Sequence, residues 1–128
     1  MRAIADTHAF LWLLTDDRRL SRRARTIMED DANTIYLSAA SVYEISLKAR
    51  LGRLVLPEAP ESFIADRLAI GMFRALVISV AHAARAGSLP PIHRDPWDRL
   101  LIAQAQIEST PIVTADRSIG AYDVETIW

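Results

Sequence analysis

Short apolar runs alternate along the chain with longer segments whose apolar residues recur at helical spacing. The apolar runs predict β-strands at residues 2–5, 35–37, 76–78 and 111–116, with residues 123–128 as a further edge strand. Helical segments separate these runs, and a strand–helix–strand order favours right-handed crossovers between parallel strands. The pattern therefore predicts an α/β fold, with a central, mainly parallel sheet flanked by helices on both faces.

Several helix boundaries carry their own signals. Ser21 is placed to cap a helix in "LSRRARTIMED", and Ser41 to cap one in "SVYEISLKARLG", which Gly52 can end. Asp95 followed by proline has the order of an N-cap and a first helical residue. Further helices are expected over residues 7–14, from about residue 61, and between the strand at 76–78 and Gly87.

Composition narrows the class of protein. With 128 residues, 51% of them hydrophobic, the chain can bury one core, and we expect residues 1–128 to form a single domain. The formal net charge of -1 provides no overall cationic field, so a nucleic acid would have to be held locally. The chain has no cysteine, which excludes disulfides and thiolate chemistry. No apolar run approaches the roughly 20 residues of a membrane helix, and we expect a soluble, cytoplasmic protein.

Four acids occupy equivalent places relative to the predicted elements. Each follows a strand directly or lies near the start of the helix after a strand or loop: Asp6, Glu44, Asp98 and Asp116. Parallel strands end at one edge of their sheet, and open sheets bind ligands outside those ends where the strand order reverses. We therefore expect the four carboxylates to converge.

Each acid also has an ordinary structural explanation. Ser41-x-x-Glu44 matches a capping box, and Asp98 in a first helical turn suits the helix dipole. Asp116 can cap the segment "RSIG", and Asp6 can be a turn residue. These explanations account for each acid singly but do not predict that all four share one edge. Asp95, directly before a proline, is better explained as a helix cap than as a reacting group.

A cluster of this kind favours a cation. Two carboxylates ~5 Å apart at an effective dielectric constant of ~20 repel by about 3 kcal/mol, so a tight group must protonate or bind a cation. Mg²⁺, with Mn²⁺ as a substitute, prefers carboxylate and water oxygens. Mg²⁺ usually takes only one or two protein carboxylates directly. We expect Asp6 and Asp98 to be direct ligands, and Glu44 and Asp116 to act through water or a second ion.

A hard cation held in an open cleft can orient a phosphodiester and lower the pKa of an attacking water, which predicts metal-assisted phosphodiester hydrolysis. No serine–histidine–aspartate set, phosphate-binding glycine loop or zinc-protease helix competes with this interpretation. Two alternatives remain open. One is a DNA nuclease or a phosphatase, although "DTH" lacks the second acid of an aspartyl phosphatase. The other is a binding module whose acidic groove receives a basic segment.

Four motifs together resemble a known family: "ADTHAFLWLL", "SAASVYEISLKARLGRLVLP", "RDPWDRLLIAQA" and "IVTADRSI". In this order they look like the PIN-domain proteins, specifically the VapC-like ribonuclease toxins of type II toxin-antitoxin systems. The resemblance implies an α/β/α sandwich and a magnesium-dependent endoribonuclease whose acidic quartet is Asp6, Glu44, Asp98 and Asp116. It also implies an RNA substrate, a homodimer, and a VapB-like antitoxin whose tail occupies the active-site groove. Trp97 stands where relatives more often carry phenylalanine.

The remaining polar residues have weaker signals. The arginines of residues 18–25 can grip phosphates that flank the cut or can form a solvated helix face, and the cations at residues 48–53 are a second such group. Thr7 and Thr114 can orient carboxylates through their hydroxyls. His8 and His93 flank acidic motifs, but a hard-cation site does not need imidazole, so we expect structural or substrate contacts from both.

Overall fold

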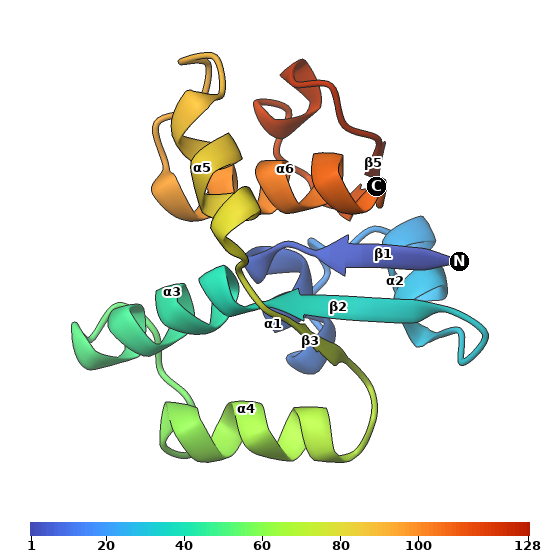
Figure 1. Cartoon of the computed structure of the whole chain (residues 1–128). Helices are drawn as coiled ribbons and strands as arrows, with labels where there is room; N and C mark the ends of the chain where they lie inside the picture. Colours follow the sequence, from blue (N-terminus) through green and yellow to red (C-terminus); the bar gives the residue numbers. More distant parts are fainter.

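The computed structural model describes residues 1–128 and contains one five-stranded sheet (Figure 1). The strands are β1 (Arg2–Ala5), β2 (Thr34–Ser38), β3 (Arg74–Leu76), β4 (Ile112–Val113) and β5 (Thr126–Ile127). The helices are α1 (Thr7–Leu14), α2 (Arg22–Glu29), α3 (Ala39–Arg50), α4 (Pro60–Ala69), α5 (Val80–Ser88) and α6 (Pro96–Glu108), with a 3-10 turn, η1, at Ile119–Ala121. No helix is long and apolar enough to cross a membrane.

All four strand pairings are parallel, in the order β3-β2-β1-β4-β5. The chain builds outward from β1 to β2 and β3, then crosses back through α5 and α6 and continues with β4 on the other side of β1. The strand order thus reverses between β1 and β4. Open parallel sheets bind ligands outside the carboxyl ends of the strands at this point.

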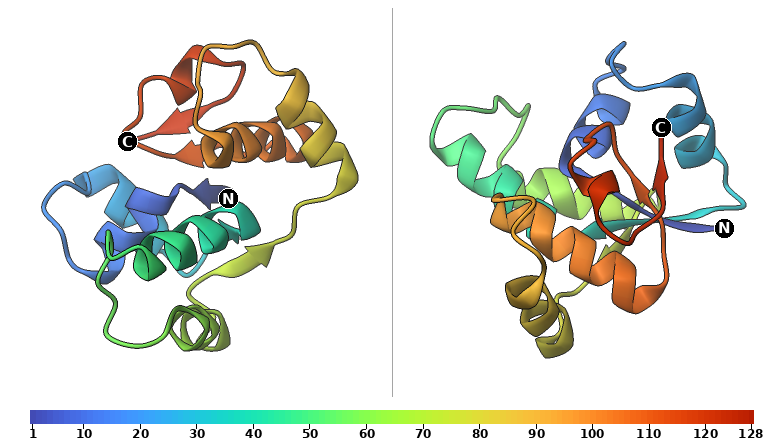
Figure 2. Two further views of the ribbon diagram at one scale, coloured as in Figure 1. Left: turned by 90° about the vertical axis from the view of Figure 1, so that its left-hand side faces the viewer. Right: turned by 90° about the horizontal axis from the view of Figure 1, so that it is seen from above.

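The sheet separates two hydrophobic clusters, as alternation of side chains along each strand requires. Ala3 and Ala5 of β1 belong to a cluster with α1, α2, α3 and α4, whereas Ile4 between them packs against α5 and α6. Figure 2 shows the same arrangement, with α5 and α6 on the face of the sheet opposite α4. This is the predicted α/β/α sandwich with a central parallel sheet.

Several boundaries differ from the sequence expectation. Strands β4 and β5 are shorter than residues 111–116 and 123–128, and α5 continues through Gly87 to Ser88. Helix α3 begins at Ala39 and is capped by Ser38, not by Ser41, because the Ser38 hydroxyl already accepts the Ala40 N–H at the end of β2. Strand β3 covers Arg74–Leu76 instead of residues 76–78, because its pairing with β2 ends at Leu76 and the chain then turns to the α5 cap at Ser79. Gly52, with φ +73°, lies directly after α3, where a left-handed conformation favours glycine.

Candidate metal centre

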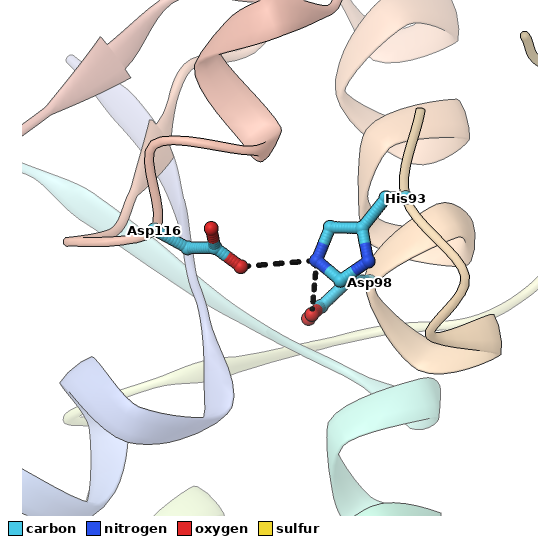
Figure 3. Close-up of side chains that lie close together, drawn as sticks. All are labelled: His93, Asp98 and Asp116. Atoms are coloured by element: carbon cyan, nitrogen blue, oxygen red, sulfur yellow. Dashed lines mark hydrogen bonds and ion pairs between the residues drawn. The ribbon is translucent and has the colours of Figure 1, made fainter. Parts of the chain in front are cut away.

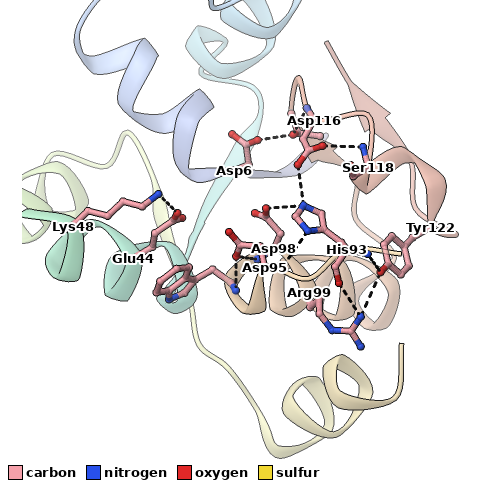
Figure 4. A network of polar contacts seen from close by, with 12 residues as sticks. Asp6, Glu44, Lys48, His93, Asp95, Asp98, Arg99, Asp116, Ser118 and Tyr122 are labelled. Atoms are coloured by element: carbon pink, nitrogen blue, oxygen red, sulfur yellow. Dashed lines mark hydrogen bonds and ion pairs between the residues drawn. The ribbon is translucent and has the colours of Figure 1, made fainter. Parts of the chain in front are cut away.

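The four predicted acids point into one space at the carboxyl edge of the sheet (Figure 4). Asp6 follows β1 and Asp116 follows β4, so these two residues flank the reversal in strand order. Asp98 lies in the first turn of α6, and Glu44 lies on α3. The fold therefore brings together residues that are up to 110 positions apart in the chain.

Asp6 is held rigidly at the start of α1. One carboxylate oxygen accepts the Ala9 N–H at 2.6 Å, which makes Asp6 the N-cap, and the other accepts the Thr114 hydroxyl. Only 5% of Asp6 is exposed, and this burial raises its pKa despite the two hydrogen bonds. Thr114 also accepts the Asp116 N–H at 3.0 Å, so its hydroxyl ties the loops after β1 and β4 together. Thr114 thus orients a carboxylate, as its neighbouring sequence suggested.

The two aspartates of "RDPWDRL" have different local roles. Asp95 caps α6, and its carboxylate accepts the N–H groups of Trp97 and Asp98 at 2.9 and 3.2 Å. Asp98 projects into the acidic space, where burial, together with the negative charges of Asp95, Glu44 and Asp6, raises its pKa to about 7. His93 opposes this rise. Burial and the surrounding carboxylates therefore favour the protonated form of Asp98.

His93 bridges two of the acids (Figure 3). Its Nε2 lies 3.0 Å from Oδ2 of Asp98 and 3.0 Å from Oδ2 of Asp116. Its Nδ1 accepts the Asp95 N–H at 3.2 Å, so the proton of the neutral ring resides on Nε2. Ligation of a metal through Nε2 would move that proton to Nδ1, where it would face the Asp95 N–H. This tautomer makes His93 a hydrogen-bond donor to the carboxylates, not a metal ligand.

Of the side chains of His93, Asp98 and Asp116, that of Asp116 is the most exposed to solvent. Burial alone would raise its pKa, but hydrogen bonds from His93 and from the Ser118 N–H outweigh burial and hold the pKa below its ordinary value. The Ser118 bond is the local turn expected from "DRS". Asp116 is therefore ionised under conditions in which its neighbour Asp98 still holds a proton.

Glu44 lies in the second turn of α3, because the helix starts earlier than the sequence suggested. The capping-box explanation for this residue is thus wrong. Its side chain is buried and forms an ion pair with Lys48 one turn later, at 2.5 Å. Lys48 therefore neutralises an acid of the cluster, in place of the phosphate contact considered for it. Ser41 accepts the Thr7 hydroxyl at 3.0 Å, so Thr7 does not orient a carboxylate.

The donor set fits a hard cation. Carboxylate oxygens of Asp98 and Asp116 lie within 4.8 Å of each other around Nε2 of His93, and Asp6 and Glu44 border the same space. Carboxylate oxygens are the ligands that Mg²⁺ and Mn²⁺ prefer. Lys48 pairs with Glu44 and His93 lies between Asp98 and Asp116, yet burial and the neighbouring carboxylates still raise the pKa of Asp98.

The sequence did not predict the residues that hold the loop before α6 in place. Arg99 donates hydrogen bonds to the carbonyls of Ala86, Leu89, Pro90 and His93 and contacts the Tyr122 hydroxyl. Tyr122 in turn donates to Pro90 and accepts the His93 N–H. Together they hold the loop that presents His93 and Asp95. The only signal for this role is an arginine in the first turn of α6, directly before the apolar run at residues 100–103.

Gln104 is a second supporting residue. It is fully buried in α6, accepts the Ser38 hydroxyl at 2.6 Å and donates to the Val77 carbonyl at 3.1 Å. It therefore links the end of β2 to the segment after β3. A glutamine inside "LLIAQA" is the sequence feature that marks it.

The arginines of residues 18–25 do not face the acids. They lie on α2 and the segment before it, and α2 lies beside the start of β1, away from the carboxyl ends of the strands (Figure 1). Arg19 pairs with Asp17, and Arg25 pairs with Asp16 and Glu29. These arginines are better explained as a solvent-exposed helix face than as residues that bind phosphates beside the acids. His8 is exposed, with its ring 5.5 Å from that of Trp12.

Comparison with known proteins agrees with this fold. The family model described as PIN domain matches residues 3–125, so the chain belongs to the PIN-domain family. A curated relative, Ribonuclease VapC16 of Mycobacterium tuberculosis (strain ATCC 25618 / H37Rv), is 41% identical over 68 residues. That alignment covers 52% of this chain and 48% of the relative, so the chain matches about half the length of this relative.

Solved structures share the fold at low sequence identity. VapBC2 from Rickettsia felis, bound to a DNA fragment from its promoter, has a TM-score of 0.71 at 12% identity, and the match covers 100% of this chain and 99% of that one. A toxin-antitoxin complex from Klebsiella pneumoniae has a TM-score of 0.68 at 19% identity, covering 98% and 96%. FitAcB from Neisseria gonorrhoeae has a TM-score of 0.65 at 24% identity, covering 100% and 97%.

Proposed function

We propose that this protein is a magnesium-dependent endoribonuclease and the toxin of a type II toxin-antitoxin module. The observation that carries the proposal is the convergence of Asp6, Glu44, Asp98 and Asp116 at the point where the strand order reverses, in a chain of the PIN-domain family. The partial similarity to a curated ribonuclease supports RNA as the substrate.

The carboxylates that would hold the ion are those whose negative charge is not paired with a lysine or arginine of the chain. Asp98 is the first choice, because a cation would offset both the burial and the neighbouring carboxylates that raise its pKa. Asp6 and Asp116 border it, and each carboxylate oxygen that already accepts one hydrogen bond keeps a second lone pair. Glu44, paired with Lys48, fits the indirect role expected for it. A bound Mg²⁺ would polarise the phosphodiester and lower the pKa of an attacking water.

The chain's own groups set the geometry for this chemistry. Thr114 fixes the orientation of Asp6, and the Asp95 cap fixes the first turn of α6, on which Asp98 stands. His93 holds Asp98 and Asp116 close to each other through one ring nitrogen. These contacts orient the acids before the substrate arrives, which is what positioning contributes to catalysis.

The decisive experiment compares the wild type with Asp98→Asn on RNA, single-stranded DNA and a small phosphoester. We expect the wild type to cut RNA with Mg²⁺ and to stop in chelator. Asp98→Asn should remain folded by circular dichroism and lose cleavage. Undiminished cutting by Asp98→Asn would refute the site assignment, and cleavage of DNA or phosphoester in preference to RNA would refute the substrate.

The partner proposed for this protein is a VapB-like antitoxin. Structures of the same fold are described as toxin-antitoxin complexes, which supports a partner of this type. The chain also has a groove of about 750 Å³ between α1, α3 and the segment before α4, with Leu11, Trp12 and Phe63 in its lining and Lys48 and Arg53 among its cations. A partner helix with an apolar face and acidic flanks would fit this groove, and a basic residue beyond the helix would reach the acids.

The partner proposal has its own test. Expression of the wild type alone should arrest growth, and co-expression with the antitoxin should restore it and co-purify a complex. A Trp12→Ala variant, altered in the groove but not at the acids, should still arrest growth and should escape the antitoxin. Full neutralisation of that variant would place the partner elsewhere. Light scattering of the free protein tests the expected homodimer.

A further inference from the structure

The aromatic pair formed by Tyr43 and Trp97 stands at the rim of the acidic space. Tyr43 immediately precedes Glu44 on α3, and Trp97 immediately precedes Asp98 on α6. Their rings lie 6.1 Å apart between centroids and are inclined by 69°, edge to face. Residues from two elements thus form one aromatic pair, and each member is next in sequence to an acid of the centre. We call this pair the aromatic rim.

The placement of the rim follows from helix geometry. Successive residues on an α-helix point about 100° apart, so a buried residue and its neighbour face different directions. Glu44 is 3% exposed and turns toward the acids, whereas Tyr43 is 62% exposed and turns toward solvent. Tyr43 therefore lies outside the hydrophobic core, and most of its side chain is open to solvent. Its contact with Trp97 explains the position of the pair but not its exposure.

The geometry leaves an aromatic face available. In an edge-to-face contact, the ring that presents its edge keeps both faces free of its partner. Nucleobases stack on such faces, and every base has a π-face to offer. In double-stranded nucleic acid the bases are already stacked on one another, so only an unpaired base can use this surface.

We propose that the aromatic rim is a nucleobase subsite, which stacks an unpaired base next to the scissile phosphate. This inference rests on the proposed ribonuclease activity and specifies its substrate as single-stranded or loop RNA. Because the stacked area of a purine exceeds that of a pyrimidine, we expect the subsite to prefer a purine. Stacking beside Glu44 and Asp98 places the backbone of the same nucleotide at the acids, and so couples base choice to the position of the cut.

The experiment combines protein variants with altered substrates. Short single-stranded RNAs carry a purine, a pyrimidine or an abasic nucleotide at each side of the cut. In the wild type, the abasic change at the stacked position should lower kcat/KM about tenfold or more, mainly through KM. In Tyr43→Leu with Trp97→Leu, the same change should have no further effect. Tyr43→Phe and Trp97→Phe, which keep the rings, should retain the purine preference.

The outcomes separate the rim from the nuclease itself. If the wild type cuts no RNA, the proposed function fails. If the wild type cuts RNA but the abasic penalty is equal in the wild type and the leucine variants, the subsite is overturned. Light scattering and circular dichroism accompany each variant. A leucine variant that is folded but changes from dimer to monomer assigns this surface to contact between copies of the chain and also overturns the proposal.

Discussion

At the scale of single residues, the pKa values of two acids of the centre are shifted in opposite directions. Burial and neighbouring negative charge raise the pKa of Asp98 to about 7, whereas hydrogen bonds from His93 and Ser118 lower that of Asp116. A carboxyl whose folded pKa exceeds its unfolded value of about 3.9 favours folding only while protonated. The contribution of Asp98 to the free energy of unfolding is therefore present below pH ~4 and is lost as the pH rises to about 7.

Replacing each acid by its amide should reveal the difference. In chelator at pH 7.5, Asp98→Asn should raise the melting temperature, because it removes a charge that the fold opposes. Asp116→Asn should lower it, because the depressed pKa means that its ionised form is stabilised by folding, with a benefit that is lost in acid. Thermal melts from pH 4 to 8 measure both. Changes of the same sign in both variants at pH 7.5 would contradict the assigned environments.

Asp95 should behave as a cap. Asp95→Ala removes the acceptor for two backbone N–H groups and should cost about 1 kcal/mol of stability, whereas Asp95→Asn keeps an acceptor oxygen and should cost little. Asp95→Asn also removes a negative charge that raises the pKa of Asp98, so the pH profile of stability should shift to lower pH. Urea titrations across pH check both effects. A profile that does not move would show that Asp95 does not act on Asp98.

At the scale of elements, the loop before α6 depends on Arg99. Its guanidinium donates to four carbonyls from α5 and the following loop. Ala86 and Leu89 are buried, so loss of the donor to their carbonyls should cost about 1–3 kcal/mol each, whereas the Pro90 carbonyl keeps the Tyr122 hydroxyl. We expect Arg99→Met to lower stability by several kcal/mol and to speed amide exchange in residues 89–95. Cleavage should fall because His93 and Asp95 lose their support.

Arg85→Met is the matched control, because Arg85 makes one exposed hydrogen bond from α5 to Gln106. It should leave stability within about 0.5 kcal/mol and exchange in residues 89–95 unchanged. Arg99→Lys keeps the charge but lacks the planar fork, so it should fall between the two. Equal amide exchange in all three variants would show that the loop does not depend on the hydrogen bonds of Arg99.

The elements also show what the sequence could predict. The strand–helix order, the caps at Ser21 and Asp95, and the parallel sheet follow from local periodicity and turn chemistry. The start of α3 does not, because Ser38 and Ser41 offer the same capping chemistry and only the end of β2 decides between them. The contacts of Arg99 and His93 depend on loops packed in three dimensions, which no local pattern encodes.

At the scale of the whole molecule, the centre exists only in the folded chain. Its acids come from the ends of β1 and β4 and from two helices, and they adjoin one another only after the chain crosses back past β1. The unfolded chain holds no such cluster. A cation bound there must therefore stabilise the native state by mass action.

Mg²⁺ should accordingly raise the melting temperature of the wild type in the absence of any RNA. At a concentration 100-fold above the dissociation constant, the stabilisation should be about 2.7 kcal/mol, and Mn²⁺ should act in the same way. Asp98→Asn should melt at a higher temperature than the wild type in chelator and should gain little from either ion. Calorimetric scans across an ion titration, with Na⁺ at matched ionic strength, separate binding from screening. Equal gains in both proteins would show that the ion binds outside this centre, because the variant lacks one of its carboxylates.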